Sequence, residues 1–146
     1  MIDEIDRAII EQLQVDGRMP YTRLGQLVGL SEAAARQRVQ RMVDAGAMQI
    51  AAVTDPMSLG KRRMAMIGVR TEGDVVAIAE QISLLDGAEY VVVTAGSFDL
   101  LVEVVTTDEV ALLDITSTIR RVPGVRSTES FIYLHLAKQT FTWGAR

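Results

Sequence analysis

The 146-residue chain has no cysteine, a single histidine and few aromatic residues. Without cysteine there can be no disulfide, no thiolate chemistry and no zinc site built from cysteine. One histidine, His135, is a poor basis for a metal site, so we expect no metal and no cofactor, and His135 should be a structural or surface residue. No apolar run reaches the ~18 residues that a membrane-spanning helix needs, so no membrane partner is expected.

The start of the chain also lacks the basic region that opens a signal peptide. Asp3, Glu4 and Asp6 stand there instead. Together with the absence of cysteine, this predicts a protein of the reducing cytoplasm. Hydrophobic residues make up 49% of the chain, which is ample for a core, and the length allows one domain or two small ones.

Positive charge is scarce except in the middle of the chain. Residues 17–63 hold eight Lys or Arg and three acids, whereas residues 1–16 and 64–146 carry net charges of −4 and −5. A local cationic surface on an acidic protein is typical of a phosphate-binding element. The alternative is a chance clustering of surface charges.

Three helices are predicted at the start of the chain, over residues 3–15, over residues 21–28, and from Ser31 to just before Gly46. Pro20 fits the first turn of the second helix, and the Ser31 hydroxyl can cap the third. Apolar residues at helical spacing mark the buried faces: Ile5, Ile9, Ile10 and Leu13, then Leu24, Leu27 and Val28, then Ala35, Val39 and Met42.

The second and third helices are joined by the short segment Gly29-Leu30, and the third is rich in arginine. Two helices joined by a tight turn, the second one basic, are the parts of a helix-turn-helix DNA reader. With residues 47–53 extended, this predicts a winged-helix-like DNA-binding domain over residues 1–53. It indicates a regulator of transcription rather than an enzyme.

The third helix should present the groups that read DNA. We expect Arg36 and Gln37 to approach base edges, since arginine can fork onto guanine. Arg38 and Arg41 should hold phosphate or brace the domain, and the alternative for Arg38 is an ion pair with an acid such as Asp6.

Four further residues complete the predicted DNA site. Tyr21, Thr22 and Ser31 lie near helix N-termini, which bind anions, and should touch phosphate. Glu32 lies near the groove, in a repulsive or cytosine-facing role. One such helix covers only a few bases, so the expected unit is a dimer on half-sites about 34 Å apart, or a multiple of that.

The second half of the chain predicts a different architecture after a linker at residues 54–63. Its segments alternate as strand 64–70, helix 74–85, strands 89–95 and 99–105, helix 108–121 and strand 125–136. We include Val110, Leu113 and Ile119 in the apolar set of the second helix. This βαββαβ order predicts a ferredoxin-like domain over residues 64–146, C-terminal tail included, and an α+β fold overall. The sheet face without helices should meet a partner subunit.

A trihelical DNA reader followed by a ferredoxin-like sheet resembles the Lrp/AsnC family of feast/famine regulators. The match runs over residues 2–136, and Ala35 and Val43 depart from the family pattern without breaking the fold. The residues that carry it, in order, are Ile5-Asp6-Arg7, Ile9-Ile10, Leu13 to Arg18, Leu24, Leu27, Gly29-Leu30-Ser31, Arg38 to Met42, Gly46, Asp55, Leu59-Gly60, Gly96-Ser97-Phe98-Asp99 and Val122 to Val125.

The resemblance implies a pocket for a small molecule, usually an amino acid, between the sheet domains of neighbouring dimers. The residues it assigns are Thr94, Gly96, Ser97, Phe98 and Asp99, with Ser127, Thr128 and Ser130 from another subunit. In that site the Asp99 carboxylate would accept a hydrogen bond from an ammonium group. The alternative is a plain hairpin turn in which Asp99 bonds its own backbone.

The expected function is that of a sequence-specific DNA-binding transcriptional regulator controlled by a small metabolite. Its partners would be double-stranded DNA, an effector such as an amino acid, and copies of itself, as a homodimer that assembles further, for example to an octamer. It would act in the cytoplasm, associated with the nucleoid. The alternatives are a metabolite-sensing oligomer that acts without DNA, and a tetrapyrrole decarboxylase-like enzyme, for which only His135 is available.

Overall fold

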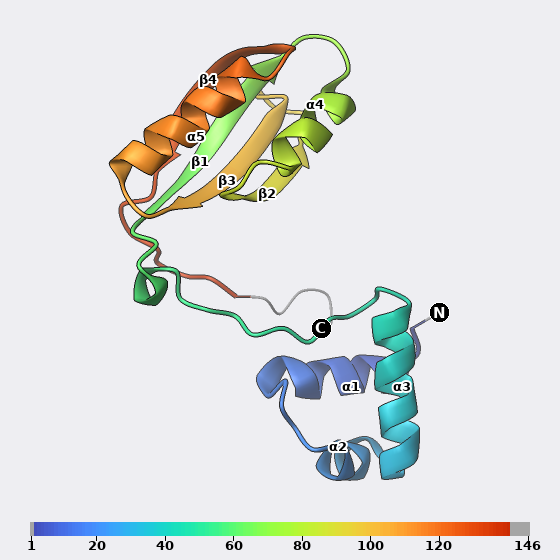
Figure 1. Ribbon diagram of the computed structural model, residues 1–146. Coiled ribbons are helices and arrows are strands. Elements are labelled where there is room, and N and C mark those ends of the chain that lie inside the picture. Colours follow the sequence, from blue (N-terminus) through green and yellow to red (C-terminus); the bar gives the residue numbers. More distant parts are fainter. Residues whose placement is uncertain (1, 141–146) are drawn as a thin grey trace. The chain divides into compact units, whose positions relative to one another are not determined.

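The computed structural model describes residues 2–140, and these form two units (Figure 1). The N-terminal unit holds residues 2–53 together with residues 138–140, and the C-terminal unit holds residues 54–137. The N-terminal unit contains helices, and the C-terminal unit contains a four-stranded sheet with helices packed on it. Within the described residues, no helix is both long enough and apolar enough to span a membrane.

The N-terminal unit consists of α1 (Glu4–Val15), α2 (Tyr21–Val28) and α3 (Glu32–Asp44). This confirms the three predicted helices. Side chains cap two of them. Ser31 accepts a hydrogen bond from the backbone N–H of Ala34 at the start of α3, as expected, and Asp3 accepts one from that of Asp6 at the start of α1. Pro20 lies at the N-cap of α2.

The core of the N-terminal unit lies where the three helices meet. Its buried members are Ile9, Leu13, Met19, Leu24, Ala35, Val39 and Met42. The prediction that Leu27 is buried was wrong, because its side chain is 53% exposed. On an eight-residue helix the inward stripe is narrow, and Leu24, Gly25 and Val28 occupy it, so Leu27 faces outward.

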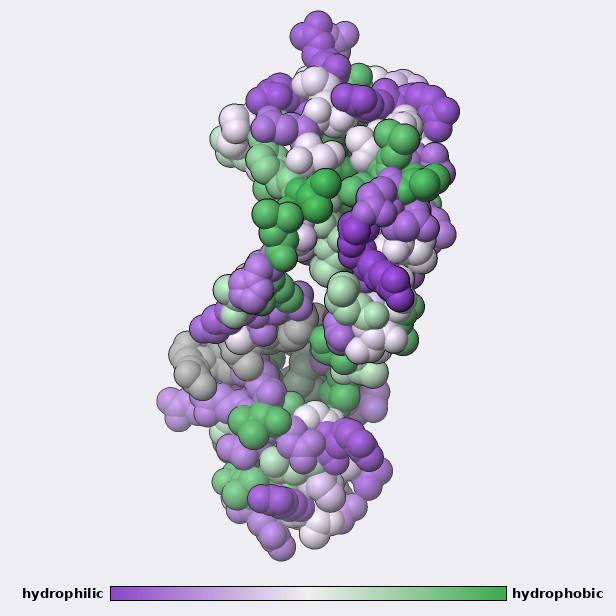
Figure 2. All heavy atoms as spheres, turned by 90° about the vertical axis from the view of Figure 1, so that its left-hand side faces the viewer, coloured by the Kyte–Doolittle hydropathy of each residue, from purple (hydrophilic) through white to green (hydrophobic). Residues whose placement is uncertain are grey.

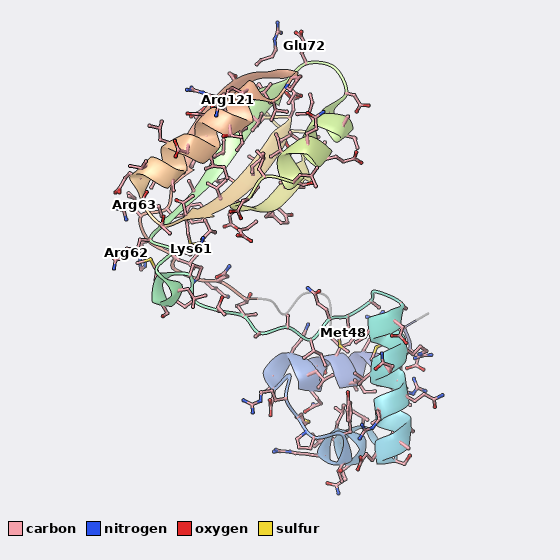
Figure 3. The ribbon with its side chains drawn as sticks, in the orientation of Figure 1. Met48, Lys61, Arg62, Arg63, Glu72 and Arg121 are labelled. Carbon is pink, nitrogen blue, oxygen red and sulfur yellow. The ribbon has the colours of Figure 1, made fainter. Side chains whose placement is uncertain are left out.

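Residues 47–53 form no strand, so the described part of the N-terminal unit has three helices and no β-wing. Met48, labelled in Figure 3, still packs against the helical core. The segment that follows contains one short 3₁₀ helix, η1 (Met57–Leu59), which ends at Gly60.

The C-terminal unit is built from β1 (Arg63–Thr71), α4 (Val75–Ser83), β2 (Ala88–Val93), β3 (Leu100–Thr106), α5 (Glu109–Arg121) and β4 (Val125–Ile132). The strands are antiparallel in the order β2-β3-β1-β4, and both helices lie on one face of the sheet (Figure 1). This confirms the predicted βαββαβ arrangement. Because β4 ends at Ile132, the exposed His135 lies beyond the sheet.

The core of the C-terminal unit lies between the sheet and the two helices. Its strand residues are Ala65, Ile67, Val69, Leu100, Val102 and Val104, and its helix residues are Ile78, Ile82, Leu112, Ile115 and Ile119. The prediction that Val110 and Leu113 belong to the buried set was wrong, because they are 68% and 64% exposed. Leu112, Ile115 and Ile119 form the inward stripe of α5, and Val110 and Leu113 lie off it.

Within the described part of the C-terminal unit, no helix covers the other face of the sheet. Residues paired across adjacent strands share a face, so Met66, Gly68 and Arg70 of β1 lie on it with Phe131 and Ser127 of β4. Figure 2 shows hydrophobic side chains exposed at the surface of this unit; the exposed ones include Tyr90 and Phe131.

Candidate nucleic-acid interface and ligand turn

The turn between α2 and α3 depends on two glycines. Gly29 ends α2 with a φ of 72°, a conformation that side chains disfavour, and the backbone N–H of Leu30 donates to the carbonyl of Gly25 at 2.8 Å. A Cβ at Gly25 would lie 2.6 Å from the carbonyl oxygen of Leu30. This close approach sets the angle between α2 and α3 that a helix-turn-helix requires.

The outer face of α3 carries an open depression of about 900 Å³. Its lining residues are Glu32, Ala33, Arg36, Gln37, Gln40, Arg41, Asp44 and Ala45. Arg36 and Gln37, the two residues predicted to approach base edges, are both exposed on it. The Arg36 side chain is 61% exposed, so its guanidinium group is accessible to a ligand on this face.

Four of the predicted DNA-binding residues contact one another at the start of α2 and α3. The carboxylate of Glu32 accepts a hydrogen bond from the Thr22 hydroxyl at 2.5 Å and another from Nη2 of Arg36 at 3.0 Å. The Arg36 guanidinium lies 4.8 Å from the centroid of the Tyr21 ring, within cation–π range. The hydrogen bond from Thr22, and then that from Arg36, hold the pKa of Glu32 below its ordinary value.

Arg38 and Arg41 point to a different set of partners. Nη1 of Arg38 lies 2.7 Å from Asp3 and 2.9 Å from Asp6, and Nη2 of Arg41 lies 2.6 Å from the other oxygen of Asp6. The Arg38 side chain is only 27% exposed. This geometry favours the bracing role for Arg38, whereas the more exposed Arg41 also borders the outer face of α3.

Asp6 is a fully buried carboxylate, and its charge is compensated by these pairs. Burial by itself would raise the pKa of Asp6, but hydrogen bonds from Arg38, the Asp3 backbone and Arg41 outweigh it and lower the pKa. The same contacts act on Asp3, whose pKa is lowered first by Arg38 and then by the Asp6 backbone. Asp6 is therefore ionised and structural at neutral pH.

The cationic block of residues 17–63 is divided between the two units. Lys61, Arg62 and Arg63 stand at the start of β1 in the C-terminal unit (Figure 3). Nε of Arg63 donates to Glu109 at 2.7 Å, and a small crevice there is lined by Gly60, Arg62, Arg63, Thr107, Asp108 and Glu109. The basic residues of this block therefore do not form a single cationic surface on the N-terminal unit.

The predicted effector turn, residues 94–99, joins β2 to β3. The backbone N–H of Thr94 donates to the carbonyl of Asp99 at 2.9 Å, and the Thr94 hydroxyl donates to the carbonyl of Phe98. Oδ2 of Asp99 accepts a hydrogen bond from the backbone N–H of Thr71 at 2.6 Å. The Asp99 side chain therefore accepts a hydrogen bond from the backbone, as in the hairpin alternative. The donor, however, belongs to β1 and not to the turn itself.

An aromatic cluster lies beside this turn on the uncovered sheet face. A Cβ at Gly68 would lie 2.7 Å from the Phe98 ring. Because glycine has no side chain, the Phe98 ring can pack directly on the backbone of β1. The Arg70 guanidinium lies 4.4 Å from the Phe98 centroid, and Phe98 and Phe131 are edge to face at 5.9 Å. Gly68, Arg70 and Phe131 were not predicted from the sequence, although the period-2 alternation of β1 places Gly68 and Arg70 on one face.

Within one chain, the three predicted effector residues of β4 lie on different faces. Ser127 pairs with Arg70 on the uncovered face, whereas Thr128 and Ser130 pair with Val69 and Ile67 on the face that the helices cover. Oγ1 of Thr128 accepts a hydrogen bond from Arg120 of α5 at 2.9 Å. The structure thus brings Ser127 to the side of the Phe98 cluster, and it does not bring Thr128 or Ser130 there. The glycine and serine of the turn, Gly96 and Ser97, are exposed.

Residues 2–140 contain no group of three or more His, Cys, Asp or Glu side chains that could hold a metal ion.

Two family models match the chain and together span most of it. Residues 2–43 match the AsnC-type helix-turn-helix domain, and residues 61–146 match the PF0864 C-terminal dimeric alpha+beta barrel domain. Among proteins of similar sequence is the HTH-type transcriptional regulator FL11 of Pyrococcus horikoshii. It is 30% identical over 141 residues, which cover 95% of this chain and 93% of that protein.

Solved structures of similar fold cover nearly the whole chain. AsnC of E. coli superposes with a TM-score of 0.84 at 26% identity, covering 97% of this chain and 99% of that one. The transcriptional regulator NMB0573 of Neisseria meningitidis, solved as a complex with L-Met, superposes with a TM-score of 0.87 at 26% identity, covering 99% and 97%. Both the helical unit and the sheet unit therefore have counterparts in these regulators.

Proposed function

The chain belongs to the Lrp/AsnC family of DNA-binding transcriptional regulators, and from this premise we propose that it reads specific duplex sites under the control of an amino acid. Its named relatives and structural neighbours are regulators, so it is a regulator of transcription and not an enzyme. We further propose that it acts as a homo-oligomer in the cytoplasm, associated with the nucleoid.

One observation carries the DNA-reading proposal: the exposed outer face of α3 presents Arg36 and Gln37 side by side. The Ser31 cap and the close turn at Gly25 hold the start of this helix in place. In helix-turn-helix proteins the early residues of the second helix contact base edges in the major groove. Arg36 suits guanine because its guanidinium can fork onto O6 and N7.

The effector proposal rests on the turn at residues 94–99. Gly96 lets a ligand approach the backbone closely, and Asp99 offers a carboxylate to an ammonium group. That the similar regulator NMB0573 was solved with L-Met supports an amino acid as the ligand class. We include Thr94, Ser97 and Phe98 in this site, with Ser127 of a neighbouring subunit on its proposed second side. Thr128 and Ser130 lie on the opposite face of β4 in every copy, so they are left out of this proposal.

The oligomer proposal rests on the uncovered face of the sheet. Tyr90 and Phe131 are exposed there, and exposed apolar area of this kind favours association with a partner. The match to a domain described as a dimeric alpha+beta barrel supports a second copy of this chain as that partner.

A DNA-binding titration of the full-length chain tests the proposal. The probe is the DNA upstream of its own gene, with a shuffled duplex of equal length as the comparison, at two salt concentrations and with a panel of amino acids. We expect tighter binding to the upstream DNA, weakening with salt as phosphate contacts require, and a change in affinity with one or more amino acids. Equal affinity for both duplexes under every condition would contradict it.

A matched pair of variants tests whether α3 recognises the bases. Arg36→Gln should reduce the preference for the upstream DNA, because it removes the fork onto guanine. Arg7→Gln makes the same change of charge at an exposed position of α1 and should leave the preference unchanged.

A further inference from the structure

We propose that Glu32 is a positioning residue that fixes the guanidinium group of Arg36 for base reading and so sets the sequence selectivity of α3. This inference rests on the proposed function, in which the outer face of α3 meets DNA. It goes beyond that function because it assigns selectivity to an acidic residue that does not itself touch a base.

The two oxygens of the Glu32 carboxylate bind groups from two different helices. Oε2 accepts a hydrogen bond from the hydroxyl of Thr22, on α2, at 2.5 Å. Oε1 accepts one from Nη2 of Arg36, one turn further along α3, at 3.0 Å. Thr22 thus anchors the carboxylate, and the anchored carboxylate anchors the guanidinium. Hydrogen bonds that involve a charged group are shorter and stronger than neutral ones, so this chain of contacts can hold an exposed side chain in place.

Tyr21 restrains the same guanidinium group from a second direction. The centroid of its ring lies 4.8 Å from Cζ of Arg36, a distance at which the ring attracts the cation. Arg36 therefore has a charged partner from its own helix and an aromatic partner from α2. An unrestrained arginine loses much rotamer freedom when it binds, and these contacts remove part of that freedom before DNA arrives.

The restraint leaves Arg36 able to read a base. A guanidinium group has five N–H donors, and one of them is used by Glu32. A fork onto O6 and N7 of guanine needs two, so enough donors remain. Glu32 therefore orients Arg36 without consuming its capacity to bind DNA.

A masking role for Glu32 makes the opposite prediction. If Glu32 held Arg36 away from DNA, removing its charge would raise the affinity for every duplex. If it positions Arg36, removing its charge lowers the affinity for the preferred duplex only, and leaves non-specific affinity equal or higher because one negative charge near the phosphates is gone. The ratio of the two affinities separates these cases.

The experiment compares full-length wild type with Glu32→Gln, which keeps the size of the side chain and an acceptor oxygen but loses the charge. The probes are a duplex selected by the wild type from a random-sequence pool and a shuffled duplex of equal length. Since a well-placed fork on guanine discriminates about 5- to 150-fold, we expect the selectivity ratio to fall about 5- to 20-fold. An unchanged ratio, or equal rises in both affinities, would overturn the proposal.

A double-mutant cycle shows whether Glu32 acts through Arg36. In an Arg36→Gln background, Glu32→Gln should have no further effect on the ratio. A fall of the same size in both backgrounds would mean that Glu32 reads DNA directly, which would also overturn the proposal. Thr22→Val, which removes the anchoring hydroxyl, should lower the ratio in the same direction as Glu32→Gln.

Tyr21→Leu removes the ring and should lower the ratio. Glu11→Gln is the matched control, because it makes the same change of charge as Glu32→Gln at an exposed position of α1, and it should leave the ratio unchanged. Thermal unfolding of each variant checks that the domain is intact. If the wild type enriches no sequence from the pool, the proposed function fails and this proposal falls with it; wild-type selectivity that Glu32→Gln leaves intact overturns this proposal alone.

Discussion

The buried carboxylate of Asp6 on α1 is paired with the guanidinium group of Arg38 on α3, at 2.9 Å. Its second oxygen binds Arg41 at 2.6 Å. A buried charge is costly unless it is paired and hydrogen-bonded, so this contact fixes how α3 lies against α1. The helix that presents Arg36 is therefore held in place by two other arginines of its own.

Asp6→Asn should destabilise the N-terminal unit by about 2 kcal/mol, because it leaves two arginines without their shared carboxylate. The measurement is urea unfolding followed by circular dichroism. Glu11→Gln, at an exposed position of the same helix, is the control and should change stability by less than about 0.5 kcal/mol. Equal stability of the two variants would contradict the bracing role of Asp6.

Acid should weaken the same contact. The pKa values of Asp3 and Asp6 are lowered from the ordinary value of 3.8, so the stability they contribute is present above pH 3.8 and is lost as the pH falls through their folded values. We expect the urea midpoint of the N-terminal unit to fall as the pH drops below 3.8. The fall should be smaller in Asp6→Asn, and an identical pH profile for both proteins would show that Asp6 does not contribute.

Gly68→Ala should destabilise the C-terminal unit by about 1–3 kcal/mol, because the added Cβ would lie 2.7 Å from the Phe98 ring. Gly96→Ala is the matched control: the nearest atom to its Cβ is Oγ1 of Thr94 at 3.9 Å, so its stability should stay near that of the wild type. Denaturant unfolding compares the two. Equal free energies of unfolding for Gly68→Ala and Gly96→Ala would contradict this prediction, because they would show that moving the Phe98 ring away from the sheet does not destabilise the unit.

Alkaline pH should act on the C-terminal unit through Tyr133. Its hydroxyl donates to Glu103 at 2.8 Å, and burial, followed by this contact, raises the pKa of Tyr133 from 10.0 to about 12. The neutral phenol is favoured in the fold, so its contribution is complete below pH 10.0 and is lost as the pH rises towards about 12. The difference in urea midpoint between wild type and Tyr133→Phe should shrink over this interval, and a constant difference would contradict it.

The sequence predicts the elements of this fold well because their signals are local. Asp3 and Ser31 occupy N-caps, and the glycine after α2 ends that helix. The burial of Leu27, Val110 and Leu113 was predicted wrongly, because a 3.6-residue period alone leaves the centre of the buried stripe uncertain by about one residue. In α5 the contact with the sheet decides which residues face inward.

The candidate sites depend on contacts that are distant in sequence. The chemistry of Arg36 and Asp99 could be predicted from residue type and position. The pairing of Arg38 with Asp6 was one of two alternatives. The hydrogen bond from Thr22 to Glu32 and the packing of Phe98 on Gly68 were not predicted. Each of these contacts joins residues from separate elements, so nothing in the local pattern of either partner specifies the other.

The most direct test is whether DNA and an amino acid influence each other's binding to the full-length protein. The DNA affinity is measured with and without the amino acid, and the amino-acid affinity with and without the DNA. We expect the same coupling factor in both directions, as linkage requires, and its loss in Asp99→Asn. Amino-acid binding that leaves the DNA affinity of the wild type unchanged would contradict control of this protein by that ligand.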